Sequence, residues 1–246
     1  MTTPPCYGII PVRYHSSRFP GKPLTPILGK PMLWHVYQQA VKCPALTQTV
    51  LATDDERIFQ AAKSYNIPIL MTSPDHTCGT ERVLEAATLL NAEDDAVILN
   101  IQGDEPALEP AMLSELYAPF TEPQTQVTTL AHRINQEEAI NPNQVKVVLS
   151  KTNRALYFSR AQIPFPRDGH HDQYWGHIGL YGFRMKTLQE FVALDHSFLE
   201  TQERLEQLRL LENDFPIHVV ITEHQGYGVD RPEDVAIVET LIQNRP

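Results

Sequence analysis

Short apolar runs alternate with longer amphipathic segments along the first hundred residues of the chain. The runs have the length and composition of buried strands, whereas apolar residues in the segments between them recur with the period of a helix. The predicted strands cover residues 7–12, 49–53, 67–71 and 96–101, and the predicted helices cover 32–42, 55–65 and 80–90. Strands separated by such helices pair in parallel through right-handed crossovers. The pattern therefore predicts a layered α/β sheet that binds ligands at the carboxyl ends of its strands.

The second half of the chain alternates less regularly. Strand-like runs lie at residues 127–131, 145–149, 178–183 and 218–221, and helical periodicity extends over 186–194, 202–213 and 232–243. No linker, low-complexity tract or repeat divides the sequence. We therefore expect a single domain over residues 1–246, with a mostly parallel sheet. An inserted subregion at about 130–215 could carry a second ligand or a dimer contact.

Charge is distributed unevenly along the chain. The sequence has 20 basic and 30 acidic residues, a formal net charge of −10, which argues against a protein that binds nucleic acid with its whole surface. The first 53 residues nevertheless contain no acidic residue, and their cations are Arg13, Arg18, Lys22, Lys30 and Lys42. This asymmetry favours an anion site near the N-terminus, with a chance fluctuation in a proline-rich start as the alternative.

The sequence carries no membrane or secretion signal. It has no run of 18 apolar residues, and its start lacks the basic and apolar regions of a signal peptide. The three cysteines, Cys6, Cys43 and Cys78, are widely spaced and form no CxxC pair, so neither a disulfide framework nor a structural zinc site is expected. We expect a cytoplasmic protein with reduced thiols and with neither a membrane nor a nucleic acid as partner.

A basic loop follows the first predicted strand, at the position where an open α/β sheet binds its ligand. Residues 13–23, RYHSSRFPGKP, offer two arginines, a lysine, serine hydroxyls and a glycine that allows a ligand to approach the backbone. The loop matches neither GxxxxGK[ST] nor GxGxxG. Its composition suits a polyphosphate, and a solvated basic loop is an equally good interpretation of the same residues.

Two aspartates beyond predicted strands are candidate ligands of a divalent cation. Asp104 lies in NIQGDEP (100–106), at the end of the central strand, and Asp230 lies in the turn before the last helix. Mg²⁺ takes one or two protein carboxylates and completes its shell with substrate phosphate oxygens. We predict that the two share one Mg²⁺ site, because the carboxyl ends of neighbouring strands converge on one crevice. Each has a simpler alternative, a turn for Asp104 and a helix N-cap for Asp230.

Two further features are weak signals when taken alone. The segment CGTER (78–82) opens a predicted helix, where free backbone N–H groups favour an anion or a base carbonyl. An N-cap role for Thr80 is equally good. The ten histidines show no HExxH spacing, and His177 stands out because it opens a predicted strand beside a glycine.

Nine blocks, in order along the chain, together resemble the 3-deoxy-manno-octulosonate cytidylyltransferase (CMP-Kdo synthetase) family. They are IIPVRYHSSRFPGKPL (9–24), GKPMLWHV (29–36), CGTER (78–82), NIQGDEP (100–106), NPNQVKVV (141–148), ALYFSRAQIPF (155–165), HIGLYGFR (177–184), LEQLR (205–209) and GVDRPED (228–234). The chain departs from the family where Cys78 replaces the usual serine, His15 the usual alanine, and Phe165-Pro166 an aromatic residue followed by aspartate.

The resemblance implies a Rossmann-type, nucleotide-diphospho-sugar transferase fold and a nucleotidyltransferase. Such an enzyme transfers CMP from CTP to the anomeric hydroxyl of 3-deoxy-manno-octulosonate (Kdo), an acidic keto-sugar, and releases pyrophosphate. The CMP-Kdo formed would activate the sugar for lipopolysaccharide-type glycan synthesis. The resemblance also implies a homodimer and Mg²⁺ held by Asp104 and Asp230.

Roles for individual residues follow from the same resemblance. Arg13 and Lys22 would clamp the triphosphate and stabilise the departing pyrophosphate, and with Asp104 and Asp230 they form the implied catalytic set. The implied nucleotide contacts are Arg13, Ser17, Lys22, Thr80, Arg82 and Gln102. The implied sugar contacts are Gln102, Arg160, His177, Tyr181, Glu206 and Gln207. Arg160 is expected at the sugar carboxylate, because a guanidinium can bind it bidentately.

Two alternatives stay open. One keeps the fold but changes the substrate to a sialic-acid-type nonulosonate, an amino-substituted octulosonate, or a sugar 1-phosphate with another nucleotide, since the basic loop suits any of these. The other is a nucleotide-binding module that has lost turnover. The presence of Arg13, Lys22, Asp104 and Asp230 argues against that second alternative.

Overall fold

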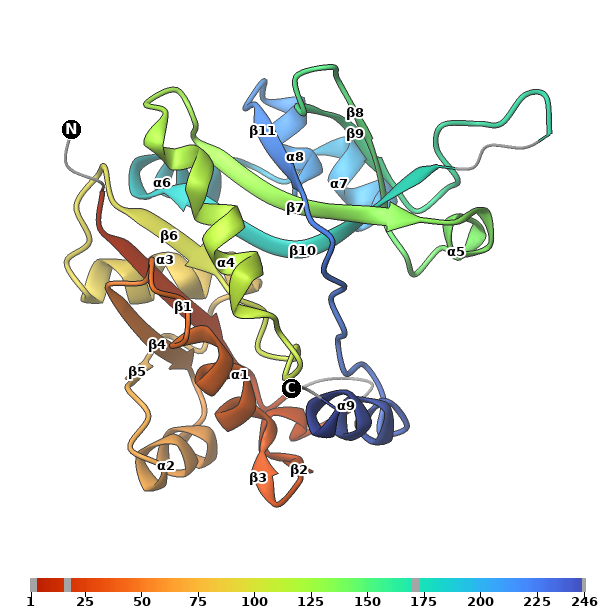
Figure 1. Cartoon of the computed structure of the whole chain (residues 1–246). Coiled ribbons are helices and arrows are strands. Elements are labelled where there is room, and N and C mark those ends of the chain that lie inside the picture. Colours follow the sequence, from red (N-terminus) through yellow and green to blue (C-terminus); the bar gives the residue numbers. More distant parts are fainter. Residues whose placement is uncertain (1–3, 16–18, 170–172, 245–246) are drawn as a thin grey trace.

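A mixed β-sheet runs through the computed structural model, which describes residues 4–15, 19–169 and 173–244 (Figure 1). Its strands are β1 (Cys6–Pro11), β4 (Gln48–Thr53), β5 (Ile69–Met71), β6 (Val97–Asn100), β7 (Val127–Ile134), β8 (Lys146–Leu149), β9 (Ala155–Ser159), β10 (Tyr174–Arg184) and β11 (Ile217–Ile221). Their order is β11-β7-β10-β6-β1-β4-β5, and β8 pairs with β10 and β9. Among these described strands, β10 pairs antiparallel with β6, β7 and β8, and β8 pairs antiparallel with β9, whereas the other pairs are parallel. The predicted layered α/β sheet is confirmed.

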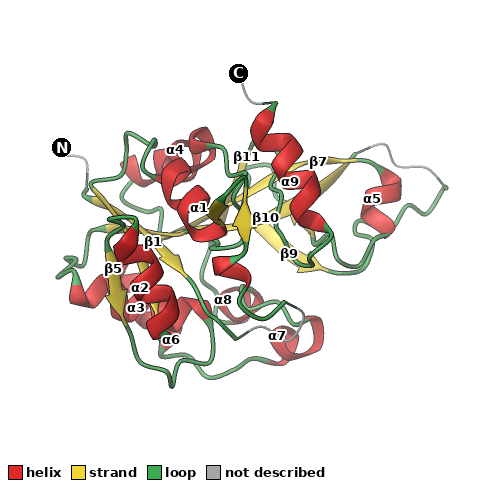
Figure 2. Cartoon of the chain, turned by 90° about the horizontal axis from the view of Figure 1, so that it is seen from below, coloured by secondary structure: helices red, strands yellow, loops and turns green. Residues whose placement is uncertain are grey.

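Helices cover both faces of this sheet (Figure 2). They are α1 (Met32–Ala40), α2 (Glu56–Ser64), α3 (Gly79–Leu89), α4 (Pro110–Tyr117), α5 (Gln136–Ile140), α6 (Met185–Val192), α7 (Phe198–Glu203), α8 (Leu208–Glu212) and α9 (Asp234–Gln243). Helices α1, α2 and α4 pack into one apolar cluster, and α3, α6 and α8 pack into a second cluster. In the described part of the chain, no helix has the length and apolar character that crossing a bilayer requires.

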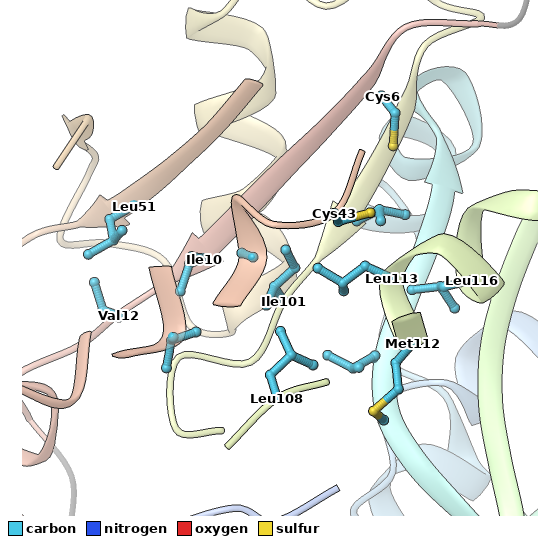
Figure 3. Packing of buried hydrophobic residues seen from close by; sticks show 14 of the residues in the cluster. Cys6, Ile10, Val12, Cys43, Leu51, Ile101, Leu108, Met112, Leu113 and Leu116 are labelled. Atoms are coloured by element: carbon cyan, nitrogen blue, oxygen red, sulfur yellow. The ribbon is translucent and has the colours of Figure 1, made fainter. Parts of the chain in front are cut away.

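The central strands form continuous apolar runs because both of their faces are covered. All four residues of β6 are buried; Leu99 belongs to one cluster and Ile98, which points the opposite way, belongs to the other. Figure 3 shows the first cluster, where Ile10 and Leu113 pack together with the free thiol of Cys43. Each fully buried leucine or isoleucine contributes about 1.5–3 kcal/mol to stability. The apolar runs therefore specify the sheet that positions the site.

The chain between β11 and α9, residues 222–233, is an extended segment that we call the return segment. Figure 1 shows it leaving β11 and running back to α9, which lies near α1 and the small hairpin of β2 (Pro26–Ile27) and β3 (Lys30–Pro31). The backbone N–H of Leu28 donates to Glu239 Oε1 at 2.9 Å. Val229 and Val238 share a small apolar cluster with Ile27. The C-terminal part of the chain is thereby fixed beside the basic loop that follows β1.

The second half of the fold differs from the predictions in several elements. The predicted helix over 202–213 is two short helices, because Arg204 between α7 and α8 has a left-handed backbone (φ 52°) that interrupts helical hydrogen bonding. Strand β10 is longer than the predicted 178–183, and α4, α5 and β9 are absent from the predicted elements. Strands β7 and β10, which overlap the predicted subregion at 130–215, belong to the central sheet.

Candidate active site

Two cavities share Pro11 and Gln102 at the carboxyl ends of β1 and β6. One has a volume of about 160 Å³; its charged lining residues are Arg13, Lys22 and Asp104, and we call it the charged cavity. The other, of about 200 Å³, we call the polar cavity. Its polar lining residues are Thr80, Asn100, Gln102, Tyr181, Glu206 and Gln207. Both lie at the edge of the sheet where ligand binding is predicted.

Lys22 joins three segments that are distant in the sequence. Its Nζ donates to Asp104 Oδ2 at 2.6 Å and to the carbonyl oxygen of Val229 at 2.9 Å. The N–H of Val229 in turn donates to the carbonyl oxygen of Asp104 at 2.8 Å. Lys22 has no acidic neighbour in the sequence, but the fold supplies one 82 positions away. The two charged side chains remain 15% and 33% exposed, so a ligand can still reach them.

The segment that carries Asp230 toward this region is not the predicted one. Strand β11 is separated from β6 by β7 and β10, so the predicted reason, convergence of neighbouring strand ends, is wrong for Asp230. The return segment instead brings the preceding residue, Val229, to Asp104 through a backbone hydrogen bond. Asp230 is not among the described residues that line the two cavities, and its share in one Mg²⁺ site stays a prediction. The N-cap alternative is also wrong. Helix α9 begins at Asp234, whose Oδ2 accepts from the backbone N–H of Asp230 at 2.8 Å.

The chemistry of these two carboxylates suits Mg²⁺. Among the described residues, no group of three or more His, Cys, Asp or Glu side chains is placed to hold a metal ion. Mg²⁺ needs only one or two protein carboxylates when phosphate oxygens and water complete its shell. Asp104 and Asp230 supply that number, so the residues present fit a magnesium ion that binds together with a nucleotide.

Arg13 and Lys22 are the cations of the basic N-terminal stretch that line the charged cavity. Arg13 Nη1 donates to the carbonyl oxygen of Thr77 at 3.2 Å, which connects the basic loop to the turn before α3. Lys30, by contrast, lies over aromatic rings away from this cavity. Ser17, an implied nucleotide contact, lies outside the described residues. The charge asymmetry of the sequence therefore pointed to a loop that lines the charged cavity, although Lys30 lies elsewhere.

The start of α3 forms one wall of the polar cavity. Cys78, and not Thr80, is the N-cap, and it forms a capping box with Glu81. The N-cap interpretation of Thr80 is therefore wrong. The Thr80 hydroxyl is free to donate to Glu206 Oε2 at 2.7 Å, which joins α3 to the residues before α8. Both members of this pair line the polar cavity.

Arg82 is buried beneath the cavity wall. Its guanidinium has no exposed surface and donates to Asp54 Oδ2 at 2.9 Å and to Thr72 Oγ1 at 2.5 Å. The described residues lining the two cavities do not include Arg82. The structure thus gives Arg82 a supporting position on α3, where it joins this helix to Asp54 and Thr72, and the implied contact with the nucleotide stays a prediction.

His177 and Tyr181 form a neutral pair on β10. His177 Nε2 lies 3.0 Å from the Tyr181 hydroxyl oxygen. Burial lowers the pKa of His177 from 6.5 to about 3, so the imidazole is uncharged at neutral pH. Burial also raises the pKa of Tyr181 well above its usual value of 10. This pair therefore supplies hydrogen-bonding groups, and His177 is unsuited to hold a proton as a general base at neutral pH.

Unpaired buried polar atoms face the polar cavity. Asn100 Oδ1 and Gln207 Nε2 are buried and have no hydrogen-bond partner among the described residues. Gln102 Nε2, in contrast, donates to the carbonyl oxygen of Gly179 at 3.0 Å. A buried polar atom without a partner costs about 1–3 kcal/mol, so a polar ligand that completes these bonds would recover that free energy. Asn100 is a site residue that the sequence analysis missed, although it begins the block NIQGDEP.

Arg160 lies outside both cavities. Its guanidinium donates to backbone carbonyl oxygens, from Nε to Glu203 at 2.8 Å and from Nη1 to Pro142 at 3.1 Å. Its backbone N–H donates to Glu203 Oε2 at 2.9 Å. These hydrogen bonds of Arg160 hold the end of α7 in place, and the chain continues from there to Glu206. The implied contact with a sugar carboxylate is not formed in this arrangement and stays a prediction.

Glu105, the residue after Asp104, carries a buried carboxyl group. Burial, together with the neighbouring charge of Asp104, raises the pKa of Glu105 to about 8. Its carboxylate faces Gly226, because a Cβ built on that glycine would lie 3.4 Å from Glu105 Oε2. The buried carboxyl group therefore packs between the loop after β6 and the return segment. No pattern in the sequence distinguished it from an exposed turn residue.

With this geometry described, comparisons with known proteins identify the family. The model of the Cytidylyltransferase family matches residues 7–219. The 3-deoxy-manno-octulosonate cytidylyltransferase of Oleidesulfovibrio alaskensis is 56% identical over 99% of this chain and 98% of its own. The 8-amino-3,8-dideoxy-manno-octulosonate cytidylyltransferase of Shewanella putrefaciens is 44% identical over 92% of this chain and 94% of its own.

Solved structures agree with this placement. CMP:2-keto-3-deoxy-manno-octonic acid synthetase, solved in complex with CTP, superposes with a TM-score of 0.92 at 38% identity, covering 97% of this chain and 98% of the other. The 4-diphosphocytidyl-2C-methyl-D-erythritol synthase superposes with a TM-score of 0.67 at 14% identity, covering 98% of this chain and all of the other, which shows a shared fold. The chain therefore belongs to the cytidylyltransferase family and, within it, to the 3-deoxy-manno-octulosonate cytidylyltransferases.

Proposed function

We propose that this protein transfers CMP from CTP to the anomeric hydroxyl of Kdo. The sugar oxygen attacks the α-phosphorus, the bond from that phosphorus to the bridging oxygen breaks, and pyrophosphate leaves with CMP-Kdo as the other product. The observation that carries the proposal is the junction of the two cavities at Pro11 and Gln102. In this proposal the phosphates bind in the charged cavity and the sugar binds in the polar cavity, so that both substrates meet at one reacting phosphorus.

In the charged cavity, Arg13 and Lys22 neutralise the triphosphate. Phosphoryl transfer depends mainly on positioning and on stabilising the charge that develops on oxygen. The ion pair of Lys22 with Asp104 is partly exposed, and such a pair contributes only about 0–1 kcal/mol. Lys22 can therefore exchange the carboxylate for a phosphate oxygen at little cost. It then stabilises the pyrophosphate as it departs.

Asp104 and Asp230 hold Mg²⁺ in this proposal. The bound ion supplies Lewis-acid polarisation of phosphate oxygens and lowers the pKa of a coordinated hydroxyl. The backbone hydrogen bond between Asp104 and Val229, the residue next to Asp230 in the sequence, supports a shared site for the two carboxylates. No histidine is required as a base, and the lowered pKa of His177 makes its imidazole a weak proton acceptor.

The polar cavity receives the acidic sugar. Gln102, Tyr181 and Gln207 offer neutral donors, and Glu206 offers an acceptor held by Thr80. Relatives that carry the Kdo name range from 44% to 56% identity to this chain, and those that carry the amino-sugar name are 44% identical, so the most similar of these relatives favour Kdo over its 8-amino analogue. The product would activate Kdo for lipopolysaccharide-type glycan synthesis.

The cellular setting and the assembly are part of the same proposal. The free thiols and the use of CTP fit a cytoplasmic enzyme. A homodimer is supported by exposed apolar side chains in the predicted subregion, where Ile140 and Leu156 are each 62% exposed and Phe165 is 81% exposed. Sedimentation velocity of the wild type and of Phe165→Ser tests this: a dimer weakened by the substitution supports the assembly, and a wild-type monomer contradicts it.

A pyrophosphate-release assay tests the proposed activity. CTP, UTP, ATP and GTP are each combined with Kdo, 8-amino-3,8-dideoxy-manno-octulosonate and a sialic-acid-type nonulosonate in the presence of Mg²⁺. We expect CTP with Kdo to be the fastest pair. UTP differs from CTP at one exocyclic group, and mispairing of a buried polar group should reduce its rate by roughly 10- to 100-fold. Comparable rates with ATP, or a preference for either other sugar, would contradict the proposal.

A further inference from the structure

Strand β10 is irregular where it passes the polar cavity. Its pairing with β7 changes from Ile178 opposite Leu130 to Tyr181 opposite Thr129, so two residues of β10 bulge out of the ladder. In a regular strand, the Cα atoms of residues 177 and 181 would lie about 13 Å apart. The bulge shortens this path. It brings the two rings to a centroid separation of 5.5 Å, which allows the contact between His177 and Tyr181.

The hydroxyl of Thr129 satisfies the backbone of this bulge. Thr129 is fully buried, and its Oγ1 lies 2.8 Å from the carbonyl oxygen of Leu180 and 3.2 Å from that of Ile178. A carbonyl oxygen can only accept a hydrogen bond, and the hydroxyl has one hydrogen to donate. The Thr129 hydroxyl therefore donates its hydrogen to the backbone carbonyl oxygens of β10. The same Oγ1 also lies 3.0 Å from His177 Nε2, and in this contact it must be the acceptor.

This count of hydrogens determines the tautomer of His177. The imidazole is neutral, so one of its two ring nitrogens carries the hydrogen. If that nitrogen were Nδ1, Nε2 would carry only a lone pair. This lone pair would lie 3.0 Å from Thr129 Oγ1, whose hydrogen is donated to the backbone, so no hydrogen bond would join the two atoms. With the hydrogen on Nε2, the contact with Thr129 is a hydrogen bond. The Tyr181 oxygen, also 3.0 Å away, shares this one N–H as a second acceptor and then has no need to donate to Nε2.

We propose that Thr129 is a positioning residue that fixes the Nε2–H tautomer of His177 and thereby leaves the Tyr181 hydroxyl hydrogen available to a ligand oxygen in the polar cavity. Tyr181 lines that cavity. It therefore binds its ligand as a hydrogen-bond donor, which suits a carboxylate or a hydroxyl of an acidic sugar. The identity of that ligand as the sugar substrate rests on the proposed function; the tautomer does not.

The tautomer is measured directly by NMR of protein labelled with ¹⁵N in its histidine rings, with His177 assigned from the signals lost in His177→Gln. We expect a protonated Nε2 and an unprotonated Nδ1 in the wild type. In Thr129→Val, which has nearly the same shape but no hydroxyl, we expect Tyr181 to donate to Nε2 and the hydrogen to move to Nδ1. Thr129→Ser, which keeps the hydroxyl, should retain the wild-type tautomer.

Steady-state kinetics provide the second readout. Thr129→Val should raise the KM for the sugar by about 5- to 10-fold, as expected for one lost hydrogen bond, and leave the KM for CTP unchanged. Thr129→Ser should restore the sugar KM to within about 2-fold. The matched control is Thr128→Val. Thr128 is equally buried and its hydroxyl donates to the carbonyl oxygen of Leu116 at 2.8 Å, so this change also leaves a carbonyl unpaired but should alter neither tautomer nor KM.

The outcomes separate this inference from the proposed function. A wild type with its hydrogen on Nδ1 would overturn the inference even if no variant folds. Equal changes of sugar KM in Thr129→Val and Thr128→Val would also overturn it, because a general loss of strand stability would then explain both. If the wild type has the Nε2–H tautomer but does not release pyrophosphate with Kdo, the proposed function fails and the tautomer assignment stands.

Discussion

The charged cavity and the polar cavity share Pro11 and Gln102, but they are built in opposite ways. The charged cavity is formed by ions on separate segments, with Lys22 and Asp104 paired at a partly exposed surface. The polar cavity is formed mainly by uncharged groups, together with the Glu206 carboxylate, and their hydrogen bonds are already directed, as in the pair of His177 and Tyr181. The ions of the charged cavity can exchange partners readily, whereas the polar cavity presents donors and acceptors in fixed positions.

This difference fits the two chemical tasks of a cytidylyltransferase. A triphosphate brings several negative charges that change during the reaction, so its site needs charges that can be redistributed. A sugar acid must be distinguished from close analogues, and buried hydrogen-bonding groups discriminate strongly because a missing partner costs about 1–3 kcal/mol. Variants in the charged cavity should therefore affect the rate, and variants in the polar cavity should affect sugar recognition.

The largest effect is expected from Asp104→Asn and Asp230→Asn. Each should reduce turnover by on the order of 100-fold or more, because the amide has the same shape but lacks the charge that holds Mg²⁺. The double variant should be little worse than either single one, since residues acting through one ion are not additive. Pyrophosphate release is measured against Mg²⁺ concentration, with circular dichroism melts as the folding control. Fully additive losses, or wild-type activity in one single variant, would refute the shared site.

Lys22→Ala should have the next largest effect. Loss of one charge-assisted contact to phosphate should cost about 2–4 kcal/mol in the transition state. Thermal stability should change by less than about 1 kcal/mol, because the pair with Asp104 is partly exposed. Lys30→Ala is the matched control, since this lysine belongs to the same basic stretch but lies over aromatic rings. Activity that declines only in proportion to folded protein would make Lys22 a structural residue.

The polar cavity should impose a pH dependence on stability. Burial depresses the pKa of His177 to about 3, whereas in the unfolded chain it stays near 6.5. The unfolded state therefore binds more protons below pH 6.5, and stability from this group is present above that pH and lost as the pH falls. Between pH 7 and pH 5 this loss is about 2 kcal/mol. Urea denaturation at both pH values should show a smaller loss in His177→Gln, and parallel losses would contradict a buried neutral imidazole.

The smallest effect is expected from Arg160→Ala. Because Arg160 braces the end of α7 through the carbonyl oxygen of Glu203, its loss should displace Glu206 and Gln207 and raise the sugar KM several-fold. The KM for CTP should change much less. Arg160→Lys should rescue only in part, since lysine has a single donating group in place of a fork. Equal changes in both KM values would show that Arg160 acts on both sites.

The sequence predicted the sheet well because its central strands are buried on both faces. Val97, Ile98 and Leu99 of β6 belong to an apolar run that can be recognised from the sequence alone. The break at Arg204 was not predictable in the same way. A left-handed backbone at a residue other than glycine is set by packing, so helical periodicity continued through it.

Many residues that line the two cavities were predictable from the sequence, but the contacts between them were not. The basic loop and the aspartates were visible as motifs, yet the ion pair of Lys22 with Asp104 spans 82 positions and depends on the fold. The predicted reason for the position of Asp230 was wrong, because the return segment and not a neighbouring strand carries it, and its role at the site stays a prediction. The hydroxyl of Thr129 gave no signal, since a buried strand threonine is ordinary until its hydrogen bonds are counted.

The central claim, that one cavity binds the triphosphate and the other binds the sugar, is tested most directly by comparing two variants in one pyrophosphate-release experiment. Lys22→Ala alters the charged cavity, and Gln207→Leu removes a buried amide from the polar cavity without changing charge. With both substrates varied, we expect Lys22→Ala to reduce turnover and raise the KM for CTP while the sugar KM is kept. Gln207→Leu should raise the sugar KM by about 10-fold while the KM for CTP is kept. If both variants raised the same KM, or if each raised both equally, the division of the site into two cavities with separate tasks would be contradicted.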